Sequence, residues 1–419
     1  MKRIPTFFVA SILMSLLAGC GGGGSGQAPT TSTSTSTATS PATSPTPTPT
    51  ASTPAPVAAV ANQIPITVSM ASGSINMPTV SVTICAPGSA TNCQTVPNVL
   101  LDTGSTGLRL ATSALNASIL SALPQQTAAG EPVAECAQFG IGNAWGGLRT
   151  ADIHLAGEVA AGTPIQIVND TAVGAAPSGC PTAVSPYGKT NGILGISVFQ
   201  RDCGIYCAQT QSNSTYFTCA GGTCTQTVMP ETAQVANPVA AFPADNNGTL
   251  ISMDAIAASG QSTLSGTLTF GIGTQTDNAP PSNGTFFAVS PSTGYLSATY
   301  AGQSLSSFFD TGSNVLFFQD NSIAQCSQIP GYYCPPAPTA LSAQIRSASG
   351  GATSVLSFTL NNAQNMSSAN PTFAALPGIG YSQAGGIFDW GMPFYYGRSV
   401  ATVFDGRTTP VGAGPGVSF

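Results

Sequence analysis

The sequence predicts a mostly β protein built from two similar lobes. Its richness in Gly, Ser and Thr, its short β-branched runs and its weak helical periodicity favour strands. Two stretches, 100–110 and 308–318, repeat one pattern of apolar residues, Asp-Thr-Gly-Ser and a second apolar run. Each half then reaches an apolar stretch containing a glycine, at Gly195 and Gly391. Since this period is far too long for a solenoid, two lobes with a cleft between them are the expected packing.

The elements of the first half follow from local patterns. A hairpin tip is expected over 137–147, where glycines interrupt an apolar run, and a buried strand is expected over 191–196. Alternating or β-branched runs predict strands at 64–68, 79–84, 98–101, 150–155, 249–253 and 266–273. A cysteine-rich insertion over 200–248 interrupts this pattern. The second half again brings strands to an aspartate and ends with the segments 386–396 and 399–412.

Each Asp-Thr-Gly-Ser is expected to form a tight turn between a buried strand and a returning strand. A single copy has an ordinary interpretation, because Asp in a turn often accepts hydrogen bonds from its own backbone. Two copies with matching apolar flanks are much harder to attribute to chance. Asp102 and Asp310 are therefore the candidate functional carboxylates.

Composition excludes one class of partner. The chain has 419 residues, 42% of them hydrophobic, which is ample for a large core. Only 6% of residues are charged, with Lys+Arg 9 against Asp+Glu 15. With so few basic residues, no basic patch that could bind a phosphate backbone is expected, and therefore nucleic-acid binding is not expected.

The N-terminus has the pattern of an export signal. Two basic residues precede an apolar run that ends in Leu-Ala-Gly-Cys at Cys20, which resembles a bacterial lipobox. That resemblance implies a signal peptide over 1–19 and a lipid anchor on Cys20; the alternative is an ordinary secretory signal with an unrelated cysteine. Residues 20–56, rich in Ser, Thr and Pro, would form a flexible tether. A cell-envelope location is expected, and Gly21 favours the outer membrane by that resemblance.

Ten cysteines follow Cys20, and an even number suits disulfides in an exported protein. Local spacing predicts three pairs: Cys85–Cys93, Cys136–Cys180 and Cys326–Cys334. The central four can pair as neighbours or nested, and the sequence leaves both open: Cys203, Cys207, Cys219 and Cys224. No metal site is expected among them, because exported cysteines oxidise and the single histidine, His154, lies far away and suits a structural role.

Over residues 63–415 the chain resembles the pepsin-like aspartic peptidases. The strongest likeness lies in the two Asp-Thr-Gly-Ser motifs, in Gly192-Ile-Leu-Gly-Ile, and in the closing segment from Trp390-Gly-Met-Pro-Phe-Tyr-Tyr onward. The resemblance implies a bilobal fold, with lobes over 57–274 and 275–419. It also implies roles for eight residues: catalytic Asp102 and Asp310, Thr103 and Thr311 joining the loops, Ser105 and Ser313 bonding the outer carboxylate oxygens, and Gly104 and Gly312 in the turns.

The implied chemistry needs no cofactor. Two carboxylates a hydrogen bond apart share one proton, for which the aspartic peptidase dyad is the standard example. One carboxylate activates a water while the other protonates the carbonyl of a peptide or protein substrate. Both motifs lie in one chain, so a monomer is expected.

The chain also departs from the family pattern. Phe139 before Gly140 replaces the tyrosine of the hairpin that covers the cleft, and Arg109 replaces the tryptophan that bonds to that tyrosine. We hypothesise that Arg109 stacks on Phe139 as a cation–π pair worth about 0.5–2 kcal/mol. Asp389 stands where an aliphatic residue is usual, close to the second loop.

Three functions are compatible with these features. The leading one is an acid-favouring endopeptidase that cuts extended peptides and prefers apolar side chains around the bond. The second is a catalytically inactive lipoprotein that binds a peptide or envelope component in the same cleft, as the altered hairpin suggests. The third, a structural or adhesion protein on a stalk, leaves the two intact loops unexplained.

Overall fold

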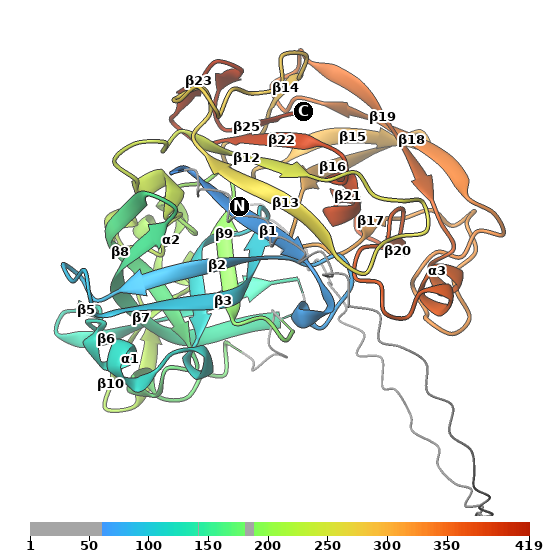
Figure 1. Ribbon diagram of the computed structural model, residues 1–419. Coiled ribbons are helices and arrows are strands. Elements are labelled where there is room, and N and C mark those ends of the chain that lie inside the picture. Colours follow the sequence, from blue (N-terminus) through green and yellow to red (C-terminus); the bar gives the residue numbers. More distant parts are fainter. Residues whose placement is uncertain (1–60, 141, 181–187) are drawn as a thin grey trace, which may run out of the picture.

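The computed structural model describes residues 61–140, 142–180 and 188–419, and they form two β lobes that meet along a shared sheet (Figure 1). The expected signal peptide, the tether and Cys20 lie outside the described residues. In Figure 1 the first half of the chain runs from blue through green to yellow, and the second half runs from orange to red. The architecture is the bilobal, mostly β arrangement of the pepsin-like fold, because both lobes carry the same loop-bearing strand unit.

The first half contributes thirteen strands: β1 Gln63–Val68, β2 Pro78–Cys85, β3 Cys93–Asp102, β4 Thr106–Ala111, β5 Thr127–Ala128, β6 Glu131–Phe139, β7 Gly142–Leu155, β8 Glu158–Val168, β9 Gly192–Ile196, β10 Tyr216–Ala220, β11 Thr223–Gln226, β12 Gly248–Met253 and β13 Leu264–Phe270. The second half contributes twelve: β14 Phe286–Ala288, β15 Leu296–Tyr300, β16 Gln303–Phe309, β17 Leu316–Phe318, β18 Thr339–Arg346, β19 Thr353–Leu360, β20 Gly380–Ser382, β21 Ile387–Trp390, β22 Ser399–Val403, β23 Thr408–Thr409, β24 Gly412–Ala413 and β25 Gly416–Ser418.

The helices are short. The α-helices are α1 Ala117–Ala122, α2 Ile205–Gln209 and α3 Ala363–Ala369. The 3-10 turns are η1 Met70–Ser72, η2 Thr112–Ala114, η3 Thr171–Val173, η4 Gln211–Asn213, η5 Glu231–Ala233, η6 Val239–Ala241 and η7 Met392–Phe394. No helix within the described ranges is both long enough and apolar enough to cross a membrane.

One three-strand unit occurs in each lobe and holds the candidate carboxylate. In the first lobe β9 lies between β3, to which it is parallel, and β4, to which it is antiparallel, with Asp102 opposite Gly195. In the second lobe β21 lies in the same way between β16 and β17, with Phe309 opposite Trp390. Each loop is thereby fixed at the end of a buried strand.

Glycine is required where these units pack most tightly. A Cβ on Gly391 would lie 2.0 Å from the carbonyl oxygen of Val315, and one on Gly195 would lie 2.8 Å from the backbone of Ser105. Real Cβ atoms do not approach backbone so closely, so these two glycines let the middle strand pass beneath each loop.

A shared sheet joins the two lobes. The pairings run from β1 to β13, from β13 to β12, from β12 to β22 and from β22 to β25. In Figure 1 yellow β12 and β13 lie beside red β22. The sheet therefore continues across the boundary expected at 274/275, and strands from both halves form the base on which the loops stand.

The core is continuous between the lobes, since one cluster of buried apolar side chains contains residues of both. Its second-lobe part is rich in aromatic rings. Phe388 stacks on Trp390 with ring centroids 4.3 Å apart, and Phe309, just before Asp310, packs on Phe394 at 4.8 Å. This aromatic packing fixes the strand that leads into the second loop.

Within the described residues, five disulfides cross-link the chain. The three pairs expected from local spacing are present: Cys85–Cys93, Cys136–Cys180 and Cys326–Cys334. The central four pair as neighbours, Cys203–Cys207 and Cys219–Cys224. The insertion that contains them adds β10 to the edge of β6, so it extends the first-lobe sheet.

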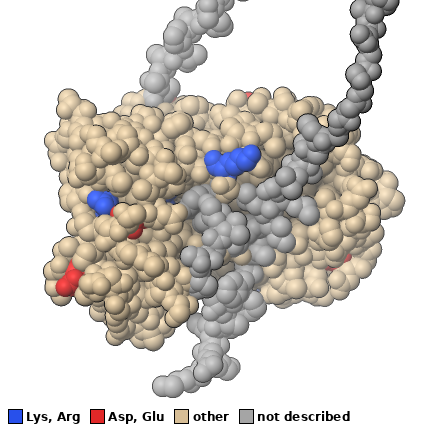
Figure 2. Space-filling view, turned by 90° about the horizontal axis from the view of Figure 1, so that it is seen from below, with Lys and Arg blue, Asp and Glu red and all other residues tan. Residues whose placement is uncertain are grey.

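One face of the molecule shows few charged side chains among the described residues. On the face shown in Figure 2 only a few isolated side chains are basic or acidic. This agrees with the low fraction of charged residues in the sequence.

Candidate active site

The two Asp-Thr-Gly loops meet at the boundary between the lobes and are joined by their threonines. The backbone N–H of Thr103 donates to Oγ1 of Thr311 at 3.1 Å, and the N–H of Thr311 donates to Oγ1 of Thr103 at 3.0 Å. Each hydroxyl then donates across the interface, Thr103 to the carbonyl of Phe309 and Thr311 to that of Leu101. These reciprocal bonds between buried groups set the distance between the two aspartates.

The inner carboxylate oxygens lie close together. The N–H of Gly104 donates to Oδ1 of Asp102 at 2.7 Å and to Oδ1 of Asp310 at 3.1 Å. The N–H of Gly312 donates to Oδ1 of Asp310 at 2.7 Å. A Cβ on Gly104 would lie 2.6 Å from Asp310, and one on Gly312 would lie 2.7 Å from Oδ1 of Asp102. Glycine at both positions is therefore a steric condition for the pair.

The serines bond the outer oxygens. Ser105 Oγ donates to Oδ2 of Asp102 at 2.5 Å, and Ser313 Oγ lies 2.8 Å from Oδ2 of Asp310. Ser313 Oγ also lies 2.6 Å from Oδ2 of Asp389, which is fully buried. The structure thus places all eight residues of the two motifs in one constellation and adds a third carboxyl behind the second loop.

Protonation of the pair follows from its surroundings. Burial raises the pKa of Asp310 well above its usual value, and the neighbouring carboxylates of Asp102 and Asp389 raise it further. A proton is therefore held on the pair under conditions in which an isolated aspartate is ionised. One neutral and one charged carboxyl side by side can serve as general acid and general base.

A cleft of about 510 Å³ lies over the carboxylates. Phe139 and Gly140, at the tip of the β6–β7 hairpin, line it on the first-lobe side. Tyr295 and Phe308 line it on the second-lobe side and stack on each other with centroids 5.0 Å apart. The cleft opens above the dyad, so a bound molecule would contact both lobes.

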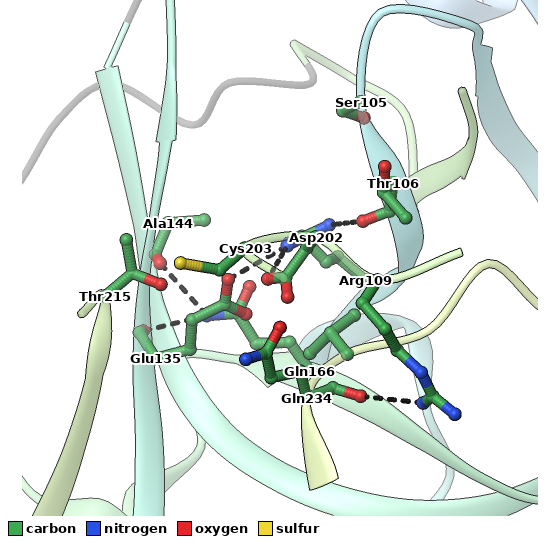
Figure 3. Close-up of polar contacts among 12 residues, drawn as sticks. Ser105, Thr106, Arg109, Glu135, Ala144, Gln166, Asp202, Cys203, Thr215 and Gln234 are labelled. Carbon is green, nitrogen blue, oxygen red and sulfur yellow. Dashed lines mark hydrogen bonds and ion pairs between the residues drawn. The ribbon is translucent and has the colours of Figure 1, made fainter. Parts of the chain in front are cut away.

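Arg109 lines the cleft too, but its principal partners are acidic. Its Nη2 lies 2.9 Å from Oε1 of Glu135 and 3.0 Å from Oδ2 of Asp202, and its Nη1 donates to the carbonyl of Thr106 at 2.5 Å. Figure 3 shows these side chains converging between the hairpin strand and the first loop. The guanidinium carbon also lies 5.6 Å from the centroid of the Phe139 ring, the contact hypothesised from the sequence.

The cluster formed by Arg109, Glu135, Asp202 and Tyr216, called the hairpin-base cluster below, is buried and short of positive charge. Burial raises the pKa of Glu135, and the charge of Asp202 adds to that effect, while Arg109 opposes both. Tyr216 donates to Oδ1 of Asp202 at 2.6 Å. The acidic members and Tyr216 were missed from the sequence; the available signal was an arginine inside an apolar strand, which requires buried partners.

His154 takes no part in this site, and the one cysteine of the described ranges that lines the cleft, Cys203, is held in a disulfide. His154 lies on β7, away from the cleft lining, and every cysteine of the described ranges is in a disulfide. No group of His, Cys, Asp and Glu within those ranges could hold a metal ion.

Comparisons with known proteins give a family and a structural match. Among solved structures, the crystal structure of an aspartic proteinase from Irpex lacteus matches with a TM-score of 0.45 and 14% identity, over 84% of this chain and 99% of that one. No curated protein matches the chain. A family model described as "Protein of unknown function (DUF3443)" matches residues 58–419, which include both loops, the hairpin and the shared sheet. The chain belongs to this DUF3443 family.

Proposed function

We propose that the protein is an aspartic endopeptidase that hydrolyses peptide bonds with a water activated between Asp102 and Asp310. The observation that carries the proposal is the single Gly104 N–H that donates to the inner oxygens of both carboxyls, at the floor of a cleft between two lobes. Two carboxyls this close share a proton, which is the state that acid–base chemistry on an amide requires.

The proposed reaction uses the dyad twice. The ionised carboxyl takes a proton from the water as the water attacks the scissile carbonyl carbon, and the protonated carboxyl donates its proton to the carbonyl oxygen. In the tetrahedral intermediate one carboxyl then donates a proton to the leaving amine while the other takes a proton from a hydroxyl of the intermediate, and the C–N bond breaks to give a carboxylic acid and an amine. The dyad ends with the same number of protons as it began.

The Thr103–Thr311 bonds support this function because they fix the two carboxyls without touching their reactive oxygens. The cleft lining supports a peptide substrate, since the hairpin tip and the aromatic pair lie on opposite sides of the dyad. An apolar side chain would pack against Tyr295 and Phe308.

The test is cleavage of a mixed peptide library by the full chain from acid to neutral pH, with and without a statine-type inhibitor. We expect cleavage that the inhibitor blocks and that Asp102→Asn abolishes. Asp254→Asn is the matched control, because Asp254 is exposed and does not line the cleft. Folded protein with its disulfides formed and no cleavage at any pH would refute the proposal and favour a cleft that only binds.

We further propose that the protein acts as a monomer anchored to the bacterial envelope through a lipid on Cys20. The support is the lipobox-like sequence and the tether of low hydrophobicity that follows it. Labelling with a radioactive fatty acid tests the anchor. The wild type should carry the label and sediment with membranes, whereas Cys20→Ala should do neither.

A further inference from the structure

Ser313 lies between two carboxyl groups and can bond properly to both only if one of them is protonated. Its Oγ is 2.8 Å from Oδ2 of Asp310 and 2.6 Å from Oδ2 of Asp389. A hydroxyl has one proton to donate and two lone pairs that accept. Between two ionised carboxylates, one of these short contacts would join two acceptors without a proton between them.

The position of the proton follows from the rest of the site. The inner side of Asp310 is engaged with Asp102 and with two glycine N–H groups, which leaves its outer oxygen as an acceptor. Asp389 is fully buried, and its Oδ1 has no hydrogen-bond partner. An ionised carboxylate in that state would keep one charged oxygen unpaired, which is far more costly than a neutral carboxyl.

No cation among the described residues compensates a charge on Asp389. Asp389 lies on β21 between β16 and β17, and neither strand carries a charged or titratable side chain. The titratable groups that act on it or on which it acts are all acids or phenols: Asp102, Asp310, Tyr295 and Tyr395. Of these, only the carboxylate of Asp102 raises the pKa of Asp389, and none of the four can supply a positive charge to it.

We propose that Asp389 is a protonated positioning residue that donates to Ser313, which in turn donates to the outer oxygen of Asp310. The order is Asp389 Oδ2–H to Ser313 Oγ, then Ser313 Oγ–H to Asp310 Oδ2. The catalytic consequence of this relay rests on the proposed peptidase function, whereas its hydrogen-bond geometry is independent of that function. In agreement with it, burial raises the pKa of Asp389 well above the usual value.

The relay makes the second loop sensitive to alkali. While Asp389 is neutral, the Ser313 proton points at Asp310 and stabilises the carboxylate form of that residue. Once Asp389 ionises, it accepts the hydrogen bond that Ser313 donates. The outer oxygen of Asp310 then has no hydrogen bond from Ser313. Cleavage would then fall on the alkaline side for a reason additional to loss of the dyad proton.

Two substitutions test whether Asp389 acts as a hydrogen-bond donor or only fills space. Asn at 389 can donate through its amide and cannot ionise, whereas Leu fills the space and cannot donate. We expect Asp389→Leu to lower kcat by roughly tenfold with KM little changed, since Ser313 loses the donor that directs its own proton toward Asp310. Asp389→Asn should retain most of the wild-type kcat. The fall of its kcat on the alkaline side of the pH–rate profile should move to higher pH.

The matched pair Ser313→Ala and Ser105→Ala tests the path of the relay. Both remove a donor to an outer carboxylate oxygen, but only Ser313 is in contact with Asp389. The difference between Asp and Asn at 389 should therefore vanish in the Ser313→Ala background and persist in the Ser105→Ala background. Equal loss in the Asn and Leu variants at every pH, or an unchanged alkaline limb in the Asn variant, would overturn the proposal.

Infrared spectroscopy gives a readout that needs no cleavage. The carbonyl stretch of a protonated carboxyl should be present in the full-length wild type at neutral pH and weakened in Asp389→Asn, with Glu135→Gln as the control at a second carboxyl whose pKa is raised by burial. An undiminished band in Asp389→Asn would refute the protonated Asp389. A wild type that shows the band and cleaves nothing would instead refute the peptidase proposal, and with it the catalytic consequence of the relay.

Discussion

The two loops have the same four residues and different surroundings. Ser105 is half-buried and bonds to Asp102, whereas Ser313 is buried and touches a second carboxyl, Asp389, behind Asp310. The position four residues after the serine also differs, because it is Arg109 in the first motif and Phe317 in the second. Arg109 binds Glu135 and Asp202, and Phe317 packs among apolar side chains.

The comparison teaches that duplication has kept the positions of the carboxyls and has let the layer behind them diverge. The first lobe supports its loop with a buried ionic cluster next to the hairpin, and the second supports its loop with aromatic packing and a third carboxyl. The motif therefore fixes where the carboxylate oxygens lie, while the supporting residues set the environment of those oxygens.

The largest expected effect tests whether the two loops remain equivalent in chemistry. Asp102→Asn and Asp310→Asn should each lower kcat/KM by at least 10²–10⁴-fold, roughly the contribution of a positioned acid or base. The measurement is initial-rate cleavage of the best library peptide, with Asp254→Asn alongside. A variant of either aspartate that keeps activity would show that only one loop is catalytic.

The free energy of unfolding should distinguish the ionic cluster behind the first loop from the apolar packing behind the second. Arg109→Leu leaves Glu135 and Asp202 buried without their cation and should cost about 3–5 kcal/mol. Phe317→Leu only reduces apolar volume and should cost roughly 1–2 kcal/mol. Urea unfolding with the disulfides intact measures both. Similar losses would mean that the hairpin-base cluster contributes no more than packing does.

The close glycines allow a third comparison of the loops. Gly391→Ala should destabilise more than Gly195→Ala, because the added Cβ would lie 2.0 Å from a backbone oxygen at Gly391 and 2.8 Å from backbone at Gly195. Overpacking of this kind costs about 1–3 kcal/mol. Thermal unfolding of the two variants gives the order, and a reversed order would contradict the tighter packing of the second unit.

The smallest effect concerns pH and stability. The pKa of Asp310 is raised in the folded state, so folded protein binds more protons there than unfolded protein does. The contribution of Asp310 to the free energy of unfolding should be largest below a pH of about 3.9, the pKa of an aspartate in the unfolded chain. It should be lost as pH rises toward the pKa of Asp310 in the folded state. Asp310→Asn should flatten this decline in urea midpoints measured at constant ionic strength. A decline identical to that of the wild type would place the bound proton elsewhere.

Local sequence patterns were sufficient to predict the two loops, the hairpin tip and three of the disulfides. Each depends on residues close together in the chain, such as Cys85 and Cys93, or on a motif that repeats. The resemblance to aspartic peptidases then related the two copies to each other. Arg109 and Asp389 were noticed because they stand where that family usually has a tryptophan and an aliphatic residue.

The rest depended on contacts distant in sequence. Glu135 and Asp202 lie in different elements, and no spacing rule brings them to Arg109. The shared sheet pairs β1 with β13 and β12 with β22, which no local pattern specifies. The bridging position of Ser313 required the register of β21 against its neighbours, because a shift by one residue would turn Asp389 to the opposite face.

The reciprocal threonine bonds have a consequence for the order of folding. They join residues 208 apart in the chain, and the shared sheet also depends on distant pairings. Contacts between distant segments form slowly, because the intervening chain must first be confined. The carboxyls therefore come together late, and a chain that is still emerging or only partly folded has no assembled dyad. We expect peptide cleavage to appear after most secondary structure during refolding, so that the topology itself delays activity.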